Sequence, residues 1–162
     1  ACSMKVPYGY EIAIEEENFV WMRNYSRDID KNIFISHRPY RHKEQFSKDS
    51  MISIRNSMVR PHILYKPEDP EGYMTTETYH MDVLWEEVNF RGAYAVRLRG
   101  LWKTNKYTMG GPFVGYGLVD EALGRFYYIE GFLYSPGSDQ RDFMRELDVI
   151  LSTFDTNKRE DV

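Results

Sequence analysis

At 162 residues the chain has the length of one domain and can bury a substantial core without disulfides or a metal. Its net charge of −4 at pH 7 provides no basic field for nucleic acid, and its short apolar runs predict no transmembrane helix. Aromatic residues make up 15% of the chain, which favours a β-rich fold, or, if the rings are exposed, a contact surface for a sugar or a peptide.

The opening residues, Ala-Cys-Ser, allow two interpretations. Alanine before Cys2 matches the end of a bacterial lipoprotein signal, but a mature lipoprotein begins at the cysteine itself, and no apolar signal region precedes it here. A cloning remnant explains residues 1–3 equally well. Cys2 is the single cysteine, which excludes an internal disulfide bond.

The first 40 residues predict three strands. Tyr10, Ile12 and Ile14 alternate with mostly polar residues, an acidic turn follows at 15–18, and β-forming residues over 19–23 continue as a second strand. Residues 26–32 are polar and predict a turn. Residues 32–40 are rich in β-formers and predict the third strand, which ends near Pro39.

A helix is predicted next, beginning at Ser47 or Asp49 as N-cap and ending at Pro61. Its apolar residues recur with helical spacing at Met51, Ile54 and Met58. Residues 65–76 contain prolines and a glycine and predict a loop. The apolar residues of 79–85 alternate with polar ones, which favours a strand, and residues 89–92 predict a hairpin turn before a strand over 93–104.

Four glycines between Thr108 and Gly117 raise the question of a phosphate-binding loop. Such a loop leads into a helix that begins with Lys and then Ser or Thr, whereas these glycines lead into β-forming residues, so the sequence argues against one. Gly110 and Gly111 are predicted to form a turn. Gly115 and Gly117 lie on one face of a strand and leave a bare patch there, against which a helix or an aromatic ring can pack.

Residues 112–134 predict two strands joined by a turn in which Gly124 is suited to a positive φ. The last segment is the clearest helix, with Ser138 or Asp139 as its cap. Its apolar residues recur at helical spacing: Phe143, Met144, Leu147, Ile150, Leu151 and Phe154. We therefore predict a single α+β domain over residues 1–162, with an antiparallel sheet of about six or seven strands covered by two amphipathic helices, and a flexible tail over 155–162.

Several motifs, in order, resemble a known family: "VPYGYEIAIEEENFVWMR", "EGYMTTE", "RGLW", "MGGPF" and the run from "EGF" through "MRELD". They are similar to the domain of unknown function 4837, a family of Bacteroidetes lipoprotein-type envelope proteins. The resemblance covers nearly the whole chain and implies that it corresponds to the C-terminal half of longer proteins in the periplasm or outer membrane. It implies no catalytic residues. The pattern of residues 124–154 also resembles the closing unit of Mog1/PsbP-like domains, which implies a binding or assembly module with helices on both faces of a sheet.

No catalytic motif is recognisable: serine nucleophile elbows, zinc-protease helices and reactive cysteine sites are absent from the sequence. His80 and Asp82 lie two residues apart, and His37 and His42 flank Pro39, but neither pair has the density of a zinc site. We accordingly predict no catalytic residue, cofactor or metal.

Glu130 lies in the middle of a predicted strand, where burial would raise its pKa unless a cation pairs with it. Arg97 and Arg99 on a neighbouring strand are the candidates for that cation. Alternatively, these arginines and Lys103 form a patch that binds an anion. The predicted ligand or partner surface comprises Arg97, Arg99, Lys103, Tyr128 and Glu130.

Two functions follow as hypotheses. The first is a non-catalytic binding or assembly domain of a bacterial cell-envelope protein, whose partner is an envelope protein or a small anionic or glycan ligand. The second is a hydrolase or binding protein that acts on envelope polysaccharide through aromatic residues and carboxylates such as Glu130 or Asp120. Hydrolysis requires two such carboxylates to face each other across one cleft. Neither involves nucleic acid, and membrane association is expected only through a lipid anchor on the parent chain.

Overall fold

The computed structural model describes residues 2–156. One antiparallel sheet contains all eight strands, in the order β1-β2-β3-β8-β7-β6-β4, with β5 also paired to β6. The strands are β1 (Glu11–Glu16), β2 (Phe19–Ser26), β3 (Ile29–Pro39), β4 (Met74–Glu77), β5 (Leu84–Phe90), β6 (Ala93–Thr104), β7 (Gly110–Asp120) and β8 (Arg125–Tyr134). The helices are α1 (Lys48–Val59) and α2 (Arg141–Leu151), with a short 3-10 helix, η1 (Lys43–Phe46), before α1.

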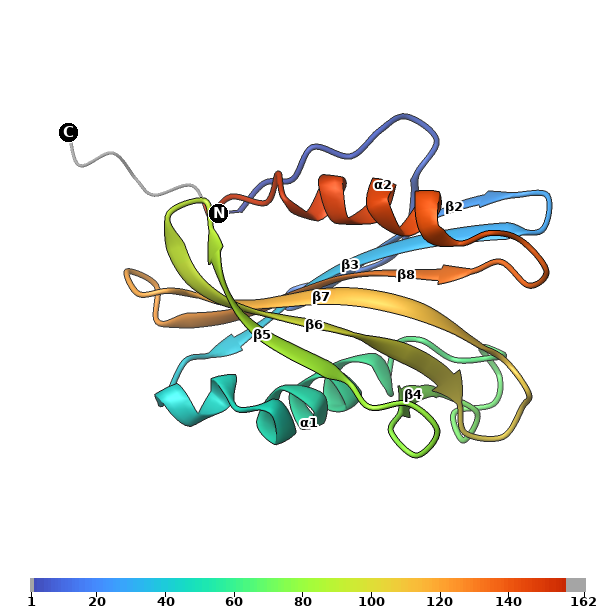
Figure 1. Cartoon of the computed structure of the whole chain (residues 1–162), viewed down its shortest axis with the longest axis horizontal. Coiled ribbons are helices and arrows are strands. Elements are labelled where there is room, and N and C mark those ends of the chain that lie inside the picture. Colours follow the sequence, from blue (N-terminus) through green and yellow to red (C-terminus); the bar gives the residue numbers. More distant parts are fainter. Residues whose placement is uncertain (1, 157–162) are drawn as a thin grey trace.

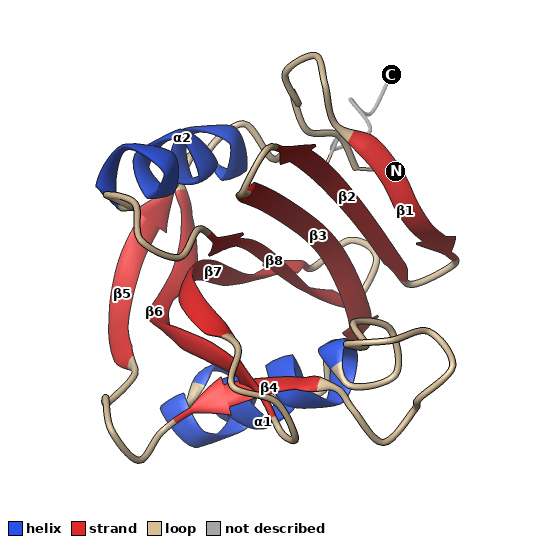
Figure 2. Ribbon diagram, turned by 90° about the vertical axis from the view of Figure 1, so that its right-hand side faces the viewer, coloured by secondary structure: helices blue, strands red, loops and turns tan. Residues whose placement is uncertain are grey.

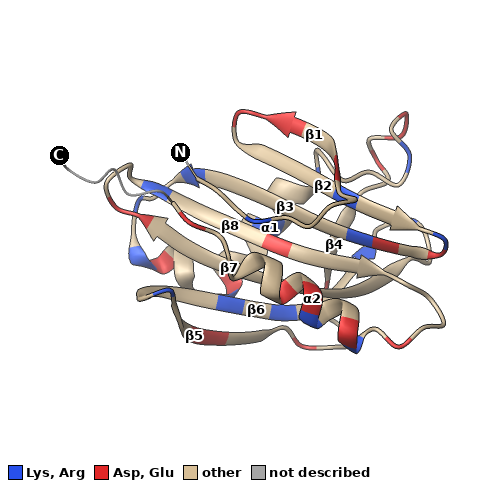
Figure 3. Cartoon of the chain, turned by 90° about the horizontal axis from the view of Figure 1, so that it is seen from above, with Lys and Arg blue, Asp and Glu red and all other residues tan. Residues whose placement is uncertain are grey.

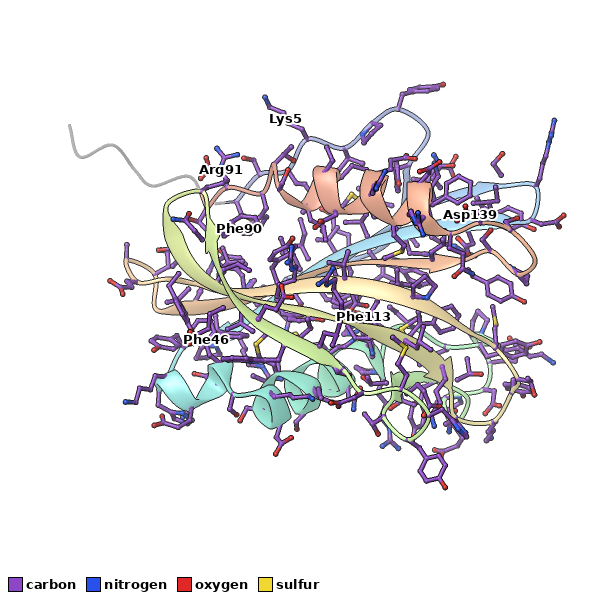
Figure 4. All side chains as sticks on the ribbon, in the orientation of Figure 1. Lys5, Phe46, Phe90, Arg91, Phe113 and Asp139 are labelled. Carbon is purple, nitrogen blue, oxygen red and sulfur yellow. The ribbon has the colours of Figure 1, made fainter. Side chains whose placement is uncertain are left out.

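The helices cover opposite faces of the sheet, which we name the α1 face and the α2 face (Figures 1 and 2). Side chains alternate between the two faces along each strand, so each face has its own hydrophobic core. Phe46 and Phe113 belong to the core on the α1 face, and Phe90 belongs to the core on the α2 face (Figure 4). The predicted α+β fold is confirmed, with eight strands in place of six or seven.

Two glycines allow α1 and an aromatic ring to approach the sheet closely, as the sequence predicts. A Cβ atom added at Gly117 would lie 2.8 Å from the Met51 Cε of α1, and one added at Gly115 would collide with the hydroxyl of Tyr128 on β8. Gly124 adopts the expected positive φ of 60°. The Arg91–Gly92 turn between β5 and β6 has positive φ at both residues, which suits a two-residue hairpin.

The predicted strand boundaries are wrong where β4 and β5 share one edge of β6. One edge of β6 pairs with β4 over Leu101–Thr104 and with β5 over Ala93–Arg99, so the chain must leave the sheet between β4 and β5. Residues 78–83 are therefore a loop, although a strand is predicted over 79–85, and β4 begins at Met74, inside the loop predicted over 65–76. The carboxylate of Glu77 accepts hydrogen bonds from the backbone N–H groups of Tyr79 and His80 and stabilises this exit.

Smaller differences concern turns, caps and the chain ends. Gly110 and Gly111 begin β7 instead of forming a turn, because they pair with Lys103 and Trp102. Ser47 caps α1 as predicted, whereas the N-cap of α2 is Gln140. The predicted tail lies mostly outside the described residues, although Asp155 still pairs with Ser3. Neither α1 nor α2, the two α-helices within residues 2–156, is long and apolar enough to cross a membrane.

Candidate functional site

One end of the α1 face is left open as a cleft. Helix α1 ends at Val59, and the loop that follows covers the sheet only in part, so a hollow of about 160 Å³ remains. We name it the aromatic cleft. It is lined by Trp21, Arg23, Asp30, Asn32, Ile63, Leu64, Tyr65, Met74, Trp102, Thr104, Met109, Phe132 and Tyr134.

Four aromatic rings from β2, β6 and β8 line the cleft. Phe132 lies between the other rings: its centroid is 6.5 Å from that of Trp21 and 5.8 Å from that of Trp102. Tyr134 follows on the same strand face, 6.1 Å from Trp102. These separations are typical of interacting aromatic pairs, so the rings hold one another in place. The cleft therefore has preformed, largely apolar walls.

A hydrogen-bonded network on the β2–β3 hairpin gives the cleft its polar side. The Arg23 guanidinium donates two hydrogen bonds to Asp30, of 3.2 and 2.5 Å, and lies 5.5 Å from the ring centroid of Trp21. The indole N–H of Trp21 donates to Asn32 Oδ1 at 2.9 Å, and the Asn32 amide donates to the Asp30 carbonyl at 3.2 Å. Because each group fixes the next, the cleft presents oriented donors and acceptors next to aromatic rings.

A buried ion pair lies in the same core and ties α1 to the sheet. Arg55 of α1 donates to both carboxylate oxygens of Glu130 on β8, at 2.6 and 2.9 Å, and both side chains are fully buried. The Tyr128 hydroxyl donates to the same carboxylate at 2.7 Å. Burial raises the pKa of Glu130, although the Arg55 charge and these hydrogen bonds oppose that change. The Arg55 Nη1 donates to Thr76, and its Nη2 also contacts the sulfur of Met74, which lines the aromatic cleft.

The structure separates the predicted surface residues into two groups. Tyr128 and Glu130 are completely buried on the α1 face, so they do not contribute to a surface. Arg97 aligns through Tyr116 with Ile129, the neighbour of Glu130, and therefore projects from the opposite face. The predicted pairing of Glu130 with Arg97 or Arg99 is wrong for this reason.

The residues of the predicted basic patch are all paired with carboxylates. Arg97 and Arg99 both bind Glu86 of β5, Arg99 at 3.0 Å, and Arg97 lowers the pKa of that carboxyl. Figure 3 shows the basic segment of β6 next to an acidic segment of β5. Lys103 binds Glu77 of β4 at 3.2 Å. An anion at this surface would compete with these carboxylates.

The remaining candidates from the sequence do not converge. Asp82 binds Lys48 at 2.7 Å. Residues 2–156 contain no group of three or more His, Cys, Asp or Glu side chains placed to hold a metal. Asp120 ends β7 and accepts a hydrogen bond from the Leu123 N–H, and it is absent from the lining of the aromatic cleft, as is Glu130.

Sequence reasoning missed the cleft residues of the β2–β3 hairpin as a site. The alternation of Phe19, Trp21 and Arg23 places them on one face, and this is the signal that was available. It does not reveal that Trp102 and Phe132, more than 80 residues away in the chain, meet Trp21 across the sheet.

A comparison with solved structures agrees with this architecture. In solved structures, the chain is similar to a single-residue mutant of the protein Mog1 with a TM-score of 0.54 and 12% identity, over 96% of this chain and 90% of that one, which shows a shared fold alone. A comparison with curated proteins finds no match. A family model described as domain of unknown function (DUF4837) matches residues 1–153. The chain therefore belongs to the DUF4837 family.

Proposed function

We propose that this chain is a non-catalytic binding module of a bacterial cell-envelope protein and that it binds one sugar ring of an envelope glycan in the aromatic cleft. The observation that carries the proposal is the meeting of four aromatic rings with the Arg23–Asp30–Asn32 network in a hollow of about 160 Å³. A cavity of about 150 Å³ holds a benzene-sized molecule, so the cleft matches one six-membered ring.

The chemistry of the lining favours a sugar over a purely apolar group. A pyranose ring has an apolar C–H face that suits an aromatic wall, and its hydroxyl groups require hydrogen-bond partners of the kind that Asp30 and Arg23 supply. A purely apolar ligand would remove water from the Arg23–Asp30 pair without offering hydrogen bonds to the donors and acceptors that this pair leaves free. A glycosidase uses two facing acids, and Asp30 is the single carboxylate among the lining residues, so we propose binding without hydrolysis.

Location in the periplasm or outer membrane, through a lipid anchor on the parent chain, is part of the same proposal. It is supported by the resemblance of the sequence motifs to envelope lipoproteins. Labelling of the full-length parent protein with radioactive palmitate, followed by membrane fractionation, tests the anchor independently of the ligand. An unlabelled parent protein in the cytoplasmic fraction would contradict this location.

Tryptophan fluorescence tests the ligand, because Trp21 and Trp102 line the cleft whereas Trp85 donates to the Phe46 carbonyl at a different part of the fold. Soluble oligomers of N-acetylglucosamine, glucose and mannose are titrated into the protein. We expect a saturable change in fluorescence, which Trp85→Phe retains. The affinity should fall at least about tenfold in Trp21→Ala, where Trp102 still reports binding, and in Asp30→Asn. Binding that is unaffected by either cleft substitution, or no saturable binding to any oligomer, would refute the proposal.

A further inference from the structure

A second, wider groove lies away from the aromatic cleft, where the end of β3 and η1 meet the beginning of α1. It has a volume of about 660 Å³, and we name it the Arg38 groove. Its polar lining consists chiefly of Arg38, Arg41, His42, Gln45, Asp49 and Ser53. None of these residues lines the aromatic cleft, so the two hollows are independent.

Arg38 is held at this groove without a carboxylate. Its Nη2 donates to Ser57 Oγ of α1 at 2.8 Å, while its Nε is buried and has no hydrogen-bond partner. Within residues 2–156 no ion pair joins it to an acid, in contrast to Arg23 and Arg55, which each bind a carboxylate. Burial lowers the pKa of Arg38 because water is partly removed from its charge. A partly desolvated guanidinium is stabilised by an anion placed within its reach.

The segment that bears the second arginine is fixed by Gln45. The Gln45 Oε1 atom accepts hydrogen bonds from the backbone N–H groups of Arg41, at 2.7 Å, and of His42, at 3.2 Å. Its amide donates to the Pro39 carbonyl at 3.3 Å, and Gln45 itself is buried. The backbone on which Arg41 and His42 sit is therefore rigid before any ligand arrives, which reduces the entropy lost on binding.

We propose that the Arg38 groove binds an oxyanion, a carboxylate or a phosphate group, through the guanidinium groups of Arg38 and Arg41. A guanidinium fork matches either oxyanion through paired N–H donors. Asp49 also lines the groove, and because its carboxylate repels an anion, it lowers the affinity of the groove for either oxyanion. The site is separate from the proposed sugar cleft, and its ligand need not be a sugar.

Titrations with inorganic phosphate and with lactate test the site, followed by ¹H–¹⁵N NMR and compared with chloride at equal ionic strength. We expect saturable shifts at residues 38–53 and, in Arg38→Gln, affinity that is weaker by about 10- to 100-fold, the range for losing hydrogen bonds to a charged group. Arg99→Gln is the matched control, since Arg99 already binds Glu86, and it should bind as the parent does. The stronger of the two probes identifies phosphate or carboxylate as the preferred group.

A second substitution gives an effect of the opposite sign. Asp49→Asn removes the one carboxylate of the groove and should strengthen phosphate binding by about two- to fivefold. If Arg38→Gln unfolds because it loses the Ser57 contact, Arg41→Gln provides the same test without that contact. Shifts that chloride reproduces, parental affinity in the folded arginine variants, or weaker phosphate binding in Asp49→Asn would each overturn the proposal.

Discussion

Removing Arg55 should destabilise the protein strongly, because it leaves a carboxylate buried without a countercharge. In Arg55→Met, Glu130 would keep the Tyr128 hydroxyl as a donor but lose both guanidinium hydrogen bonds, of 2.6 and 2.9 Å. The substitution also removes the contact of the guanidinium with the Phe113 ring, at 4.2 Å. Breaking a fully buried pair in this way costs about 3–5 kcal/mol, a large share of the roughly 5–15 kcal/mol that stabilises a typical domain.

The measurement is urea and thermal unfolding at pH 7, followed by circular dichroism. At about 2–4 °C per kcal/mol for a chain of this size, the melting temperature of Arg55→Met should fall by about 6–20 °C. The double variant Arg55→Met/Glu130→Leu removes both charges and should recover part of the loss. Recovery stays partial because the Tyr128 hydroxyl then lacks its acceptor, at a cost of about 1–3 kcal/mol.

The pH dependence of Arg55→Met provides an independent check. Without Arg55, nothing cationic opposes the burial that raises the pKa of Glu130, so the folded state binds a proton at a higher pH than the unfolded chain. The part of the penalty that comes from the buried Glu130 charge is then complete above the folded pKa and disappears below the unfolded pKa of about 4.5. The difference from the parent should shrink as the pH falls toward that value. A loss below about 1 kcal/mol at pH 7, or a double variant less stable than Arg55→Met, would refute this reasoning.

Three further predictions concern other parts of the fold. Gly117→Ala would place a Cβ atom 2.8 Å from the Met51 Cε and 2.9 Å from the Phe126 Cζ and should cost about 1–3 kcal/mol in urea unfolding; unchanged stability would mean that these two side chains move aside at little cost. The pKa of Glu77 is lowered to about 2, chiefly by the hydrogen bonds that it accepts from two backbone N–H groups. Its contribution to stability is therefore present above pH 4.5 and lost as the pH falls toward 2. Melting temperatures of Glu77→Gln and the parent should therefore converge across that window, and a constant gap would argue against the assignment. Ser47→Ala removes the N-cap bond to the Ser50 N–H and should cost about 1 kcal/mol, measured by the same unfolding assay; no loss would exclude a capping role.

Local patterns in the sequence were sufficient for the helices, most strands and the close approach at Gly115 and Gly117. Each of these depends on neighbouring residues: the 3.6-residue spacing of the apolar residues of α2, a capping serine, or glycines on one strand face. The alternation of Trp21 and Arg23 likewise indicated one face of a strand. These features are set by chain segments of about 5 to 15 residues, within which the order of side chains fixes the geometry.

Tertiary structure alone decided which residues meet. Arg55 occupies the buried stripe of α1, four residues after Met51, yet only the register of β6, β7 and β8 shows that it, and not Arg97, reaches Glu130. The aromatic cleft likewise requires three strands distant in the chain to bring their side chains to one face at the point where α1 ends. A shift of one residue in strand register moves every side chain of that strand to the other face, and the sequence of one strand does not state its register with the next.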